Sequence, residues 1–229
     1  MDQILAEYGV LLSEVDDWFR RCVASAGTRI RCSEGCSECC RGLFDITLLD
    51  AAYLKAGFHQ LDECTKASVH DRCRSRVDGL CKMWPEFAPP YILNYRPEDD
   101  WDLLMPDDDE TPCPLLGGDG ACLVYPYRPM TCRLHGIPLV DLSGEVLHDE
   151  WCTHNFIGEN PLGDSRLQGG HSAIFSREVQ LLRRFSDELL GRTFFELDTF
   201  IPTALLLDFE RYDWKSFADW LGRHLPDAR

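Results

Sequence analysis

The chain has 229 residues, which at roughly 100 to 200 residues per domain allows one domain with additions or two small domains. Apolar residues make up 45% of it and aromatic residues 11%, a composition that excludes disordered, collagen-like and low-complexity proteins. A net charge of -16 would repel a phosphate backbone, so we expect no nucleic-acid partner. Eight of the carboxylates fall within residues 98–110, inside a proline-punctuated segment, 89–112, that we expect on the surface.

The cellular location is predicted from the start of the chain and from its hydropathy. The first residues carry no cationic region ahead of an apolar run, so we expect no signal peptide. No apolar run approaches the roughly 18 residues of a membrane span, so no membrane partner is expected. We therefore expect a cytoplasmic protein. In a reducing compartment, clustered cysteines are more often metal ligands or redox groups than disulfides.

The spacing of apolar residues predicts a mainly helical α+β fold in one domain over residues 1–229. We expect helices, in chain order, over residues 2–24, 47–56, 62–83, 129–135, 171–190, 202–210 and 214–225. The first and fifth of these carry the clearest amphipathic stripes. Thr47 and Asp50 have the spacing of a capping box at the start of the second helix.

Two β-hairpins are predicted in the middle of the chain, over residues 113–125 and 137–147, each with a glycine-containing turn. Residues 28–42 show neither a helical nor a strand period, which is typical of an irregular loop. We expect this loop and the hairpins to form a metal-stapled core over residues 28–157. The N-terminal helix and the C-terminal helices over 171–225 would pack on that core.

The cysteines carry the most specific signal. Eight of the twelve lie on expected loops, hairpins and the short helix between the hairpins: Cys32, Cys36, Cys39, Cys40, Cys113, Cys122, Cys132 and Cys152. Eight thiols match two four-ligand centres, or one centre with spare redox thiols. The other four, Cys22, Cys64, Cys73 and Cys81, lie on helices, where plain packing is the expected role.

These motifs resemble the YkgJ-type cysteine-cluster family. The matching residues are Cys32-x3-Cys36-x2-Cys39-Cys40, Cys113-Pro114-x-Leu116, Cys122-x2-Tyr125-x2-Arg128-Pro129-x2-Cys132-Arg133 and Cys152. The resemblance implies a zinc- or iron-chelating domain, without an agreed activity for most members. Flagellin lysine methylases look like relatives, so methyl transfer enters as a family-level alternative. The chain carries no separate nucleotide-binding glycine motif to support it.

Two features bear on how the thiols would be used. Neighbouring side chains diverge in most backbone conformations, so we expect Cys39 and Cys40 to serve different roles. Cys132 is predicted in the first turn of its helix, where the helix dipole favours a thiolate. Arg128 and Arg133 flank it, and their charge would offset the negative charge of a thiolate-bound cofactor. A salt bridge from either arginine to the acidic segment is the alternative.

The nature of the centre stays open at this point. The x3-then-x2 spacing of the loop resembles the cluster motif of radical S-adenosylmethionine enzymes, but the chain lacks the alternation of a β/α barrel. Zinc accepts variable loop spacing, so zinc and an iron–sulfur cluster are equally expected. His135 and His154 are alternative ligands near Cys132 and Cys152.

The function expected is metal binding in a redox, electron-transfer or metal-handling role. The alternatives are a metal-cluster-dependent enzyme, such as a protein methyltransferase, and a structural zinc module that presents a surface to a protein partner.

Overall fold

The structure is a computed structural model that describes residues 1–33, 35–94, 101, 103–106 and 108–224. Its fold is mainly helical α+β, as the sequence predicts. The helices are α1 (Asp2–Ala26), α2 (Leu48–Phe58), α3 (Glu63–Met83), α5 (Met130–Leu134), α6 (His171–Leu190), α7 (Ile201–Leu206) and α8 (Trp214–His224). The strands are β1 (Asp45–Thr47), β2 (Leu139–Val140), β3 (Val146–His148) and β4 (Asp198–Phe200), and the short 3-10 turns are η1 (Gly27–Arg29), η2 (Tyr125–Tyr127), η3 (Pro161–Gly163) and η4 (Ser165–Leu167).

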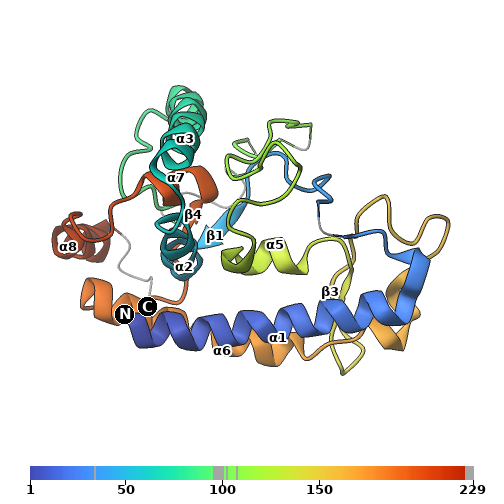
Figure 1. Ribbon diagram of the computed structural model, residues 1–229. Coiled ribbons are helices and arrows are strands. Elements are labelled where there is room, and N and C mark those ends of the chain that lie inside the picture. Colours follow the sequence, from blue (N-terminus) through green and yellow to red (C-terminus); the bar gives the residue numbers. More distant parts are fainter. Residues whose placement is uncertain (34, 95–100, 102, 107, 225–229) are drawn as a thin grey trace.

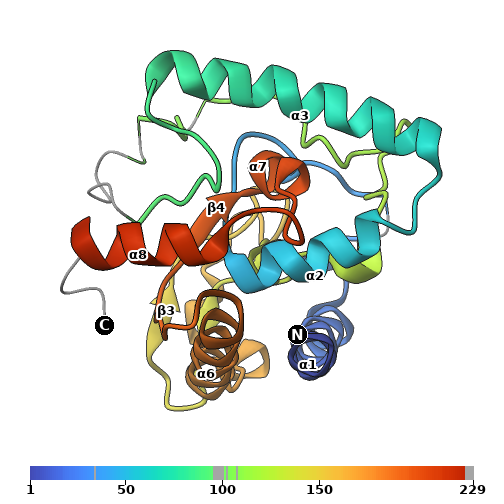
Figure 2. The same cartoon turned by 90° about the vertical axis from the view of Figure 1, so that its left-hand side faces the viewer.

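The long helices α1 and α6 form one side of the molecule. They lie side by side at the bottom of Figure 1 and of Figure 2, with α3 on the opposite side and α2 and α7 between. Glu14 accepts two hydrogen bonds from Arg177, at 2.6 and 2.8 Å, and Glu7 pairs with Arg184. The buried face of α1 joins the main core: Ile4, Tyr8, Leu11, Leu12, Val15, Trp18 and Cys22. The predicted apolar stripe of this helix is therefore confirmed.

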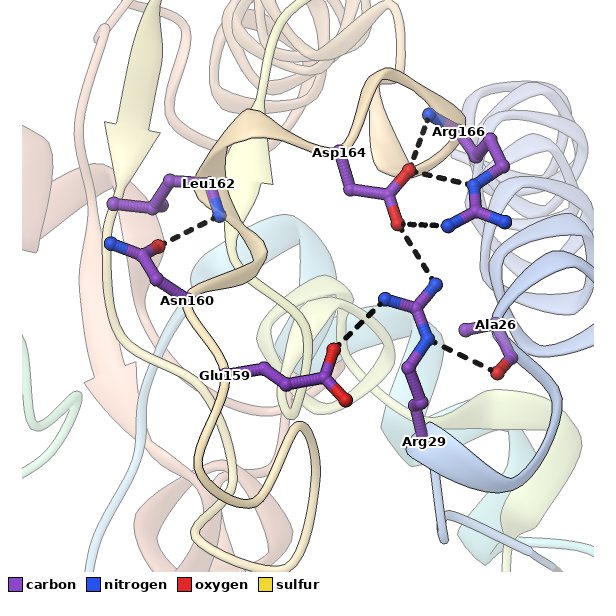
Figure 3. Close-up of polar contacts among 7 residues, drawn as sticks. All are labelled: Ala26, Arg29, Glu159, Asn160, Leu162, Asp164 and Arg166. Carbon is purple, nitrogen blue, oxygen red and sulfur yellow. Dashed lines mark hydrogen bonds and ion pairs between the residues drawn. The ribbon is translucent and has the colours of Figure 1, made fainter.

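The end of α1 is held to the segment before α6 by a polar network, drawn in Figure 3. Arg29 donates to Glu159 at 3.3 Å and to Asp164 at 2.9 Å. Asp164 also accepts from Arg166, and these partners hold the pKa of its carboxyl well below the usual range. The N–H of Phe156 donates to the carbonyl of Arg29 at 2.8 Å, and the N–H of Arg31 donates to the Asn155 side chain at 2.8 Å. These contacts hold the beginning of the cysteine loop, residues 28–42, against residues 155–156.

The strand pairing differs in part from the prediction. The hairpin of β2 and β3 is confirmed, with Leu139 opposite His148. Residues 113–125 form a turn closed by an isolated bridge between Leu116 and Cys122, without full strands. The physical reason is that Cys113 donates its N–H outward, to the carbonyl of Cys40, and Pro114 has no N–H to give.

The second two-stranded sheet joins β1 to β4, in antiparallel register with Asp45 opposite Phe200. Each strand leads directly into a helix, β1 into α2 and β4 into α7. Thr47 caps α2 as predicted, accepting from the N–H of Asp50 at 3.0 Å. This sheet brings α2 and α7 into contact with each other.

The four cysteines outside the motifs do not all behave alike. Cys22 and Cys73 are fully buried in apolar clusters, as predicted. Cys81 is partly buried and its thiol donates to the carbonyl of Phe87 at 3.1 Å. Cys64 is exposed, so the packing role predicted for it is wrong; it lies in the first turn of α3, on the face opposite Cys73.

One helix end at the C-terminal side also differs. The helix predicted over 202–210 is α7, which ends at Leu206 because the carboxylate of Asp208 then accepts from the N–H groups of Glu210 and Arg211 in a turn. The last predicted residue of the final helix, 225, lies outside the described residues. No helix in the described part of the chain is both long and apolar enough to cross a membrane.

Candidate metal centre

Six of the eight motif cysteines line one small cavity of about 80 Å³: Cys36, Cys39, Cys40, Cys113, Cys122 and Cys132. Apolar side chains close its floor, among them Leu54 of α2, Leu115 and Ile201 of α7. The cavity lies where the cysteine loop, the 113–125 turn and α5 meet. Thiols from three separate segments of the chain are thus gathered at one place.

Backbone hydrogen bonds hold the loop in position. The N–H of Cys113 donates to the carbonyl of Cys40 at 2.8 Å, and the N–H of Gly42 donates to the carbonyl of Thr111 at 2.8 Å. Arg41 and Pro112 form an antiparallel bridge between these two contacts. The loop therefore pairs like a strand with residues about 70 positions later in the sequence.

Burial dominates the electrostatics of the deeper thiols. Burial raises the pKa of Cys113 to about 12, and it raises the pKa of Cys132 well above its ordinary value. The expected thiolate-favouring effect of the helix start is therefore outweighed at Cys132. The physical reason is that α5 has only five residues, while the cavity excludes water from the thiol.

Cys32 and Cys152 do not line this cavity, and they lie together beside Gly136. A Cβ on Gly136, whose φ is +104°, would come within 3.2 Å of the Cys32 sulfur and 3.8 Å of the Cys152 Cβ. Asn155 organises the pair: its side-chain amide donates to Cys32 at 3.2 Å and to the carbonyl of Gly136 at 2.7 Å. Its N–H donates in turn to the carbonyl of Cys152 at 2.8 Å.

Cys39 and Cys40 correct one expectation. Their thiols are in hydrogen-bond contact rather than pointing apart, because residues 37–40 form a tight turn. The two remain inequivalent for another reason. The contact raises the pKa of Cys39 far above its ordinary value, whereas Cys40, aided by the charges of Arg128 and Arg41, has its pKa lowered to about 7.

The two arginines take different positions. Arg128 lines the cavity and lies over the Tyr125 ring at 3.7 Å. Its charge helps to lower the pKa of Cys40, and at Cys122 and Cys132 it only opposes the larger effect of burial, which raises their pKa. Arg133 is buried and is not part of the cavity wall. It pairs with Asp16 of α1 and donates to the carbonyls of Arg128 and Pro126, so its partner is α1 and not the acidic segment.

Of the two histidines, His135 lines the cavity and His154 does not. Burial lowers the pKa of His135, which favours the neutral imidazole that binds metals. His154 is exposed, with its Nε2 at 3.7 Å from Glu38 of the cysteine loop.

The residues of the cavity suit a metal by the type of their donor atoms rather than by their present spacing. All twelve cysteines are free thiols. In the part of the chain that the structure describes, no three His, Cys, Asp or Glu side chains converge closely enough to hold a metal ion. The donor set nevertheless suits zinc or an iron–sulfur cluster, because soft thiolates select these centres. Binding would require the cavity thiols to move toward one another.

A buried carboxylate cluster lies on the other side of α5, and the sequence analysis missed it. Asp50 is 3% exposed and accepts hydrogen bonds from the Tyr8 hydroxyl at 2.6 Å and from the Met130 N–H at 2.9 Å. Glu178 of α6 accepts from the same hydroxyl at 3.1 Å. A second cavity, of about 420 Å³, contains both carboxylates, and His135 lines it as well as the cysteine cavity.

Neither Asn155 nor this cluster has a sequence signal of its own. Asp50 and Thr47 indicate a helix start, and nothing in their spacing points to Tyr8, 42 residues earlier. Comparisons of the chain with protein-family models, with curated proteins and with solved structures find no match. The resemblance to the YkgJ-type family therefore depends on the motif residues alone.

Proposed function

We propose that the motif cysteines bind metal, as zinc or an iron–sulfur cluster, and that this cytoplasmic protein works in a redox, electron-transfer or metal-handling role. The observation that supports this most is the gathering of six motif thiols at one small, largely apolar cavity. Packing alone does not require so many thiols in one place, since a single buried cysteine such as Cys22 packs as an ordinary small apolar side chain of α1.

The effects of the thiols on one another's pKa favour two groups of ligands. Cys40 is close enough to Cys113 and Cys122 for its charge to raise their pKa, and these two act in the same way on Cys132. Cys32 is similarly influenced by Cys152 and Cys36. We infer a first centre on Cys40, Cys113, Cys122 and Cys132, and a second on Cys32, Cys36 and Cys152, with Cys39 between them. Arg128 would offset the negative charge of the first.

Metal analysis of protein purified without oxygen tests the proposal. We expect at least about one equivalent of zinc plus iron, and nearer two equivalents or clusters if both groups bind. A visible absorption band identifies an iron–sulfur cluster, whereas a colourless protein that holds metal identifies zinc. Less than about one equivalent in freshly isolated protein would contradict metal binding.

An enzyme is the second candidate, and one observation favours it. His135 lines both the cysteine cavity and the larger cavity that holds Asp50 and Glu178, so a titratable side chain connects the candidate centre to a space for a substrate. An enzyme requires an open coordination position. Imidazole or cyanide added to the metal-loaded protein should then change its spectrum; an unchanged spectrum favours a closed, structural or electron-transfer centre, or a structural module for a protein partner.

A further inference from the structure

A groove on the far side of Cys113 has features that metal binding does not explain. It lies between α3 and the segment 111–118 and has a volume of about 690 Å³. Its lining combines two arginines, hydroxyl groups and glycines: Arg72, Arg76, Ser75, Thr111, Gly79 and Gly118. Cys113 forms part of its wall and part of the cysteine cavity.

The groove is cationic in a protein that is strongly acidic. Arg72 and Arg76 stand one helical turn apart on α3, so their side chains share a face. Arg76 pairs with Asp109 and donates to the Thr111 hydroxyl at 3.3 Å. Arg72 donates to the carbonyl of Leu116 at 3.4 Å, and among the described residues no carboxylate lies within ion-pair distance of it. Most of its N–H donors therefore remain available to a ligand.

Two glycines indicate that the groove is kept open. Gly79 lies within α3, and glycine in a helix interior destabilises the helix relative to alanine. A Cβ built on Gly79 would have no neighbour within 4 Å. Gly118 is equally unhindered, and neither residue has a positive φ. Neither backbone conformation nor packing requires glycine at these two positions. Their common property is that both border the groove, where a side chain would occupy space beside the arginines.

We propose that this groove binds a small phosphate-bearing molecule. Guanidinium groups bind phosphate oxygens in bidentate fashion, and the Ser75 hydroxyl adds a further donor on the same helix. The volume accommodates more than a single phosphate ion. The net charge of -16 disfavours a polyanion such as a nucleic acid, which would meet the rest of the surface, but it leaves a small anion free to enter a local cationic groove. The proposal does not depend on whether the cysteines hold metal.

Calorimetric titration of the full-length protein with pyrophosphate and with ADP, at low ionic strength, tests the proposal. We expect Arg72→Gln to weaken binding at least about tenfold, because a charge-assisted contact is lost. The matched control is Arg74→Gln, which removes the same charge from the same helix. Arg74 pairs with Asp71 at 2.8 Å and does not line the groove, so its loss should leave binding within about twofold.

Gly79→Leu provides a second variant that separates ligand binding from folding. Leucine should raise the melting temperature by about 2 °C, because it is the better helix former, while its side chain blocks the groove and weakens binding. The proposal is overturned if the wild-type protein binds neither pyrophosphate nor ADP, if Arg72→Gln and Arg74→Gln weaken binding equally, or if Gly79→Leu binds normally. Equal affinity for succinate would overturn the phosphate class. Metal content measured on the same samples reports separately on the cysteine centres.

Discussion

At the scale of single residues, the pair Cys39 and Cys40 shows how a turn changes the chemistry of adjacent side chains. The Cys39 thiol stays protonated and donates toward Cys40, and the charges of Arg128 and Arg41 act in the same direction on Cys40. One thiol of the pair is thereby prepared to ionise near neutral pH, whereas the other is not.

Alkylation of the two thiols tests this asymmetry. In the metal-loaded protein we expect both to be protected, since Cys40 would be a ligand and Cys39 lies between the two groups. After chelation, Cys40 should be labelled faster than Cys39, with half its maximal rate at about pH 7, the pKa of Cys40. Mass-spectrometric mapping of iodoacetamide adducts measures both rates. Equal labelling of the pair after chelation would contradict the arrangement described here.

Substitution should also distinguish the roles of the two arginines near α5. Arg133→Met leaves two backbone carbonyls without their donor, and Asp16 keeps only the more distant Arg128, at 3.7 Å, so we expect a loss of about 2 kcal/mol in the free energy of unfolding. Metal content should stay near the wild-type value when the variant is folded. Arg128→Gln should do the opposite, weakening metal binding with little loss of stability. Urea unfolding and metal analysis distinguish them, and a reversed pattern would refute the assignment.

At the scale of elements, the cysteine loop, the 113–125 turn and α5 are short pieces that contact one another mainly through backbone pairing and thiols. Such irregular segments bury little apolar surface of their own, so bound metal would stabilise them.

Substitution of single cysteines tests that dependence. Cys113→Ser and Cys132→Ser should each lose metal and lower the melting temperature, because the free energy of metal binding is also free energy of folding. The control is Cys73→Ala, a buried cysteine of α3 that packs in the same cluster without lining the cavity. It should keep its full metal content. If all three variants hold the same metal and melt together, the division into ligand and packing cysteines is wrong.

At the scale of the whole molecule, three helices meet at one polar point: Tyr8 of α1 bonds to Asp50 of α2 and to Glu178 of α6. Burial raises the pKa of Asp50 to about 6, and burial together with the charge of Asp50 raises the pKa of Glu178 to about 8. The folded protein thus binds protons more tightly than the unfolded chain between the ordinary carboxyl range and about pH 8.

The stability of the fold should therefore fall as pH rises through this window, since a raised carboxyl pKa stabilises the folded state only while the proton is bound. Glu178→Gln cannot ionise and still accepts from Tyr8. We expect it to match the wild type near pH 5 and to be more stable by about 1 to 2 kcal/mol near pH 9. Urea unfolding at both pH values measures the difference, in which any shared metal contribution cancels. Parallel pH dependence in the two proteins would contradict the prediction.

Local spacing was sufficient for the long helices, because their signal is carried by neighbouring residues. The helix predicted over 171–190 is α6 with the same bounds, and the helix predicted over 62–83 is α3, Glu63–Met83. The motif also identified the cysteines that line the cavity. Three features could not be predicted from the sequence: the contact of the two adjacent thiols, the pairing of β1 with β4 and the hydrogen bond of Tyr8 with Asp50. Each depends on turn geometry or on residues brought together from distant parts of the chain, and only packing creates such contacts.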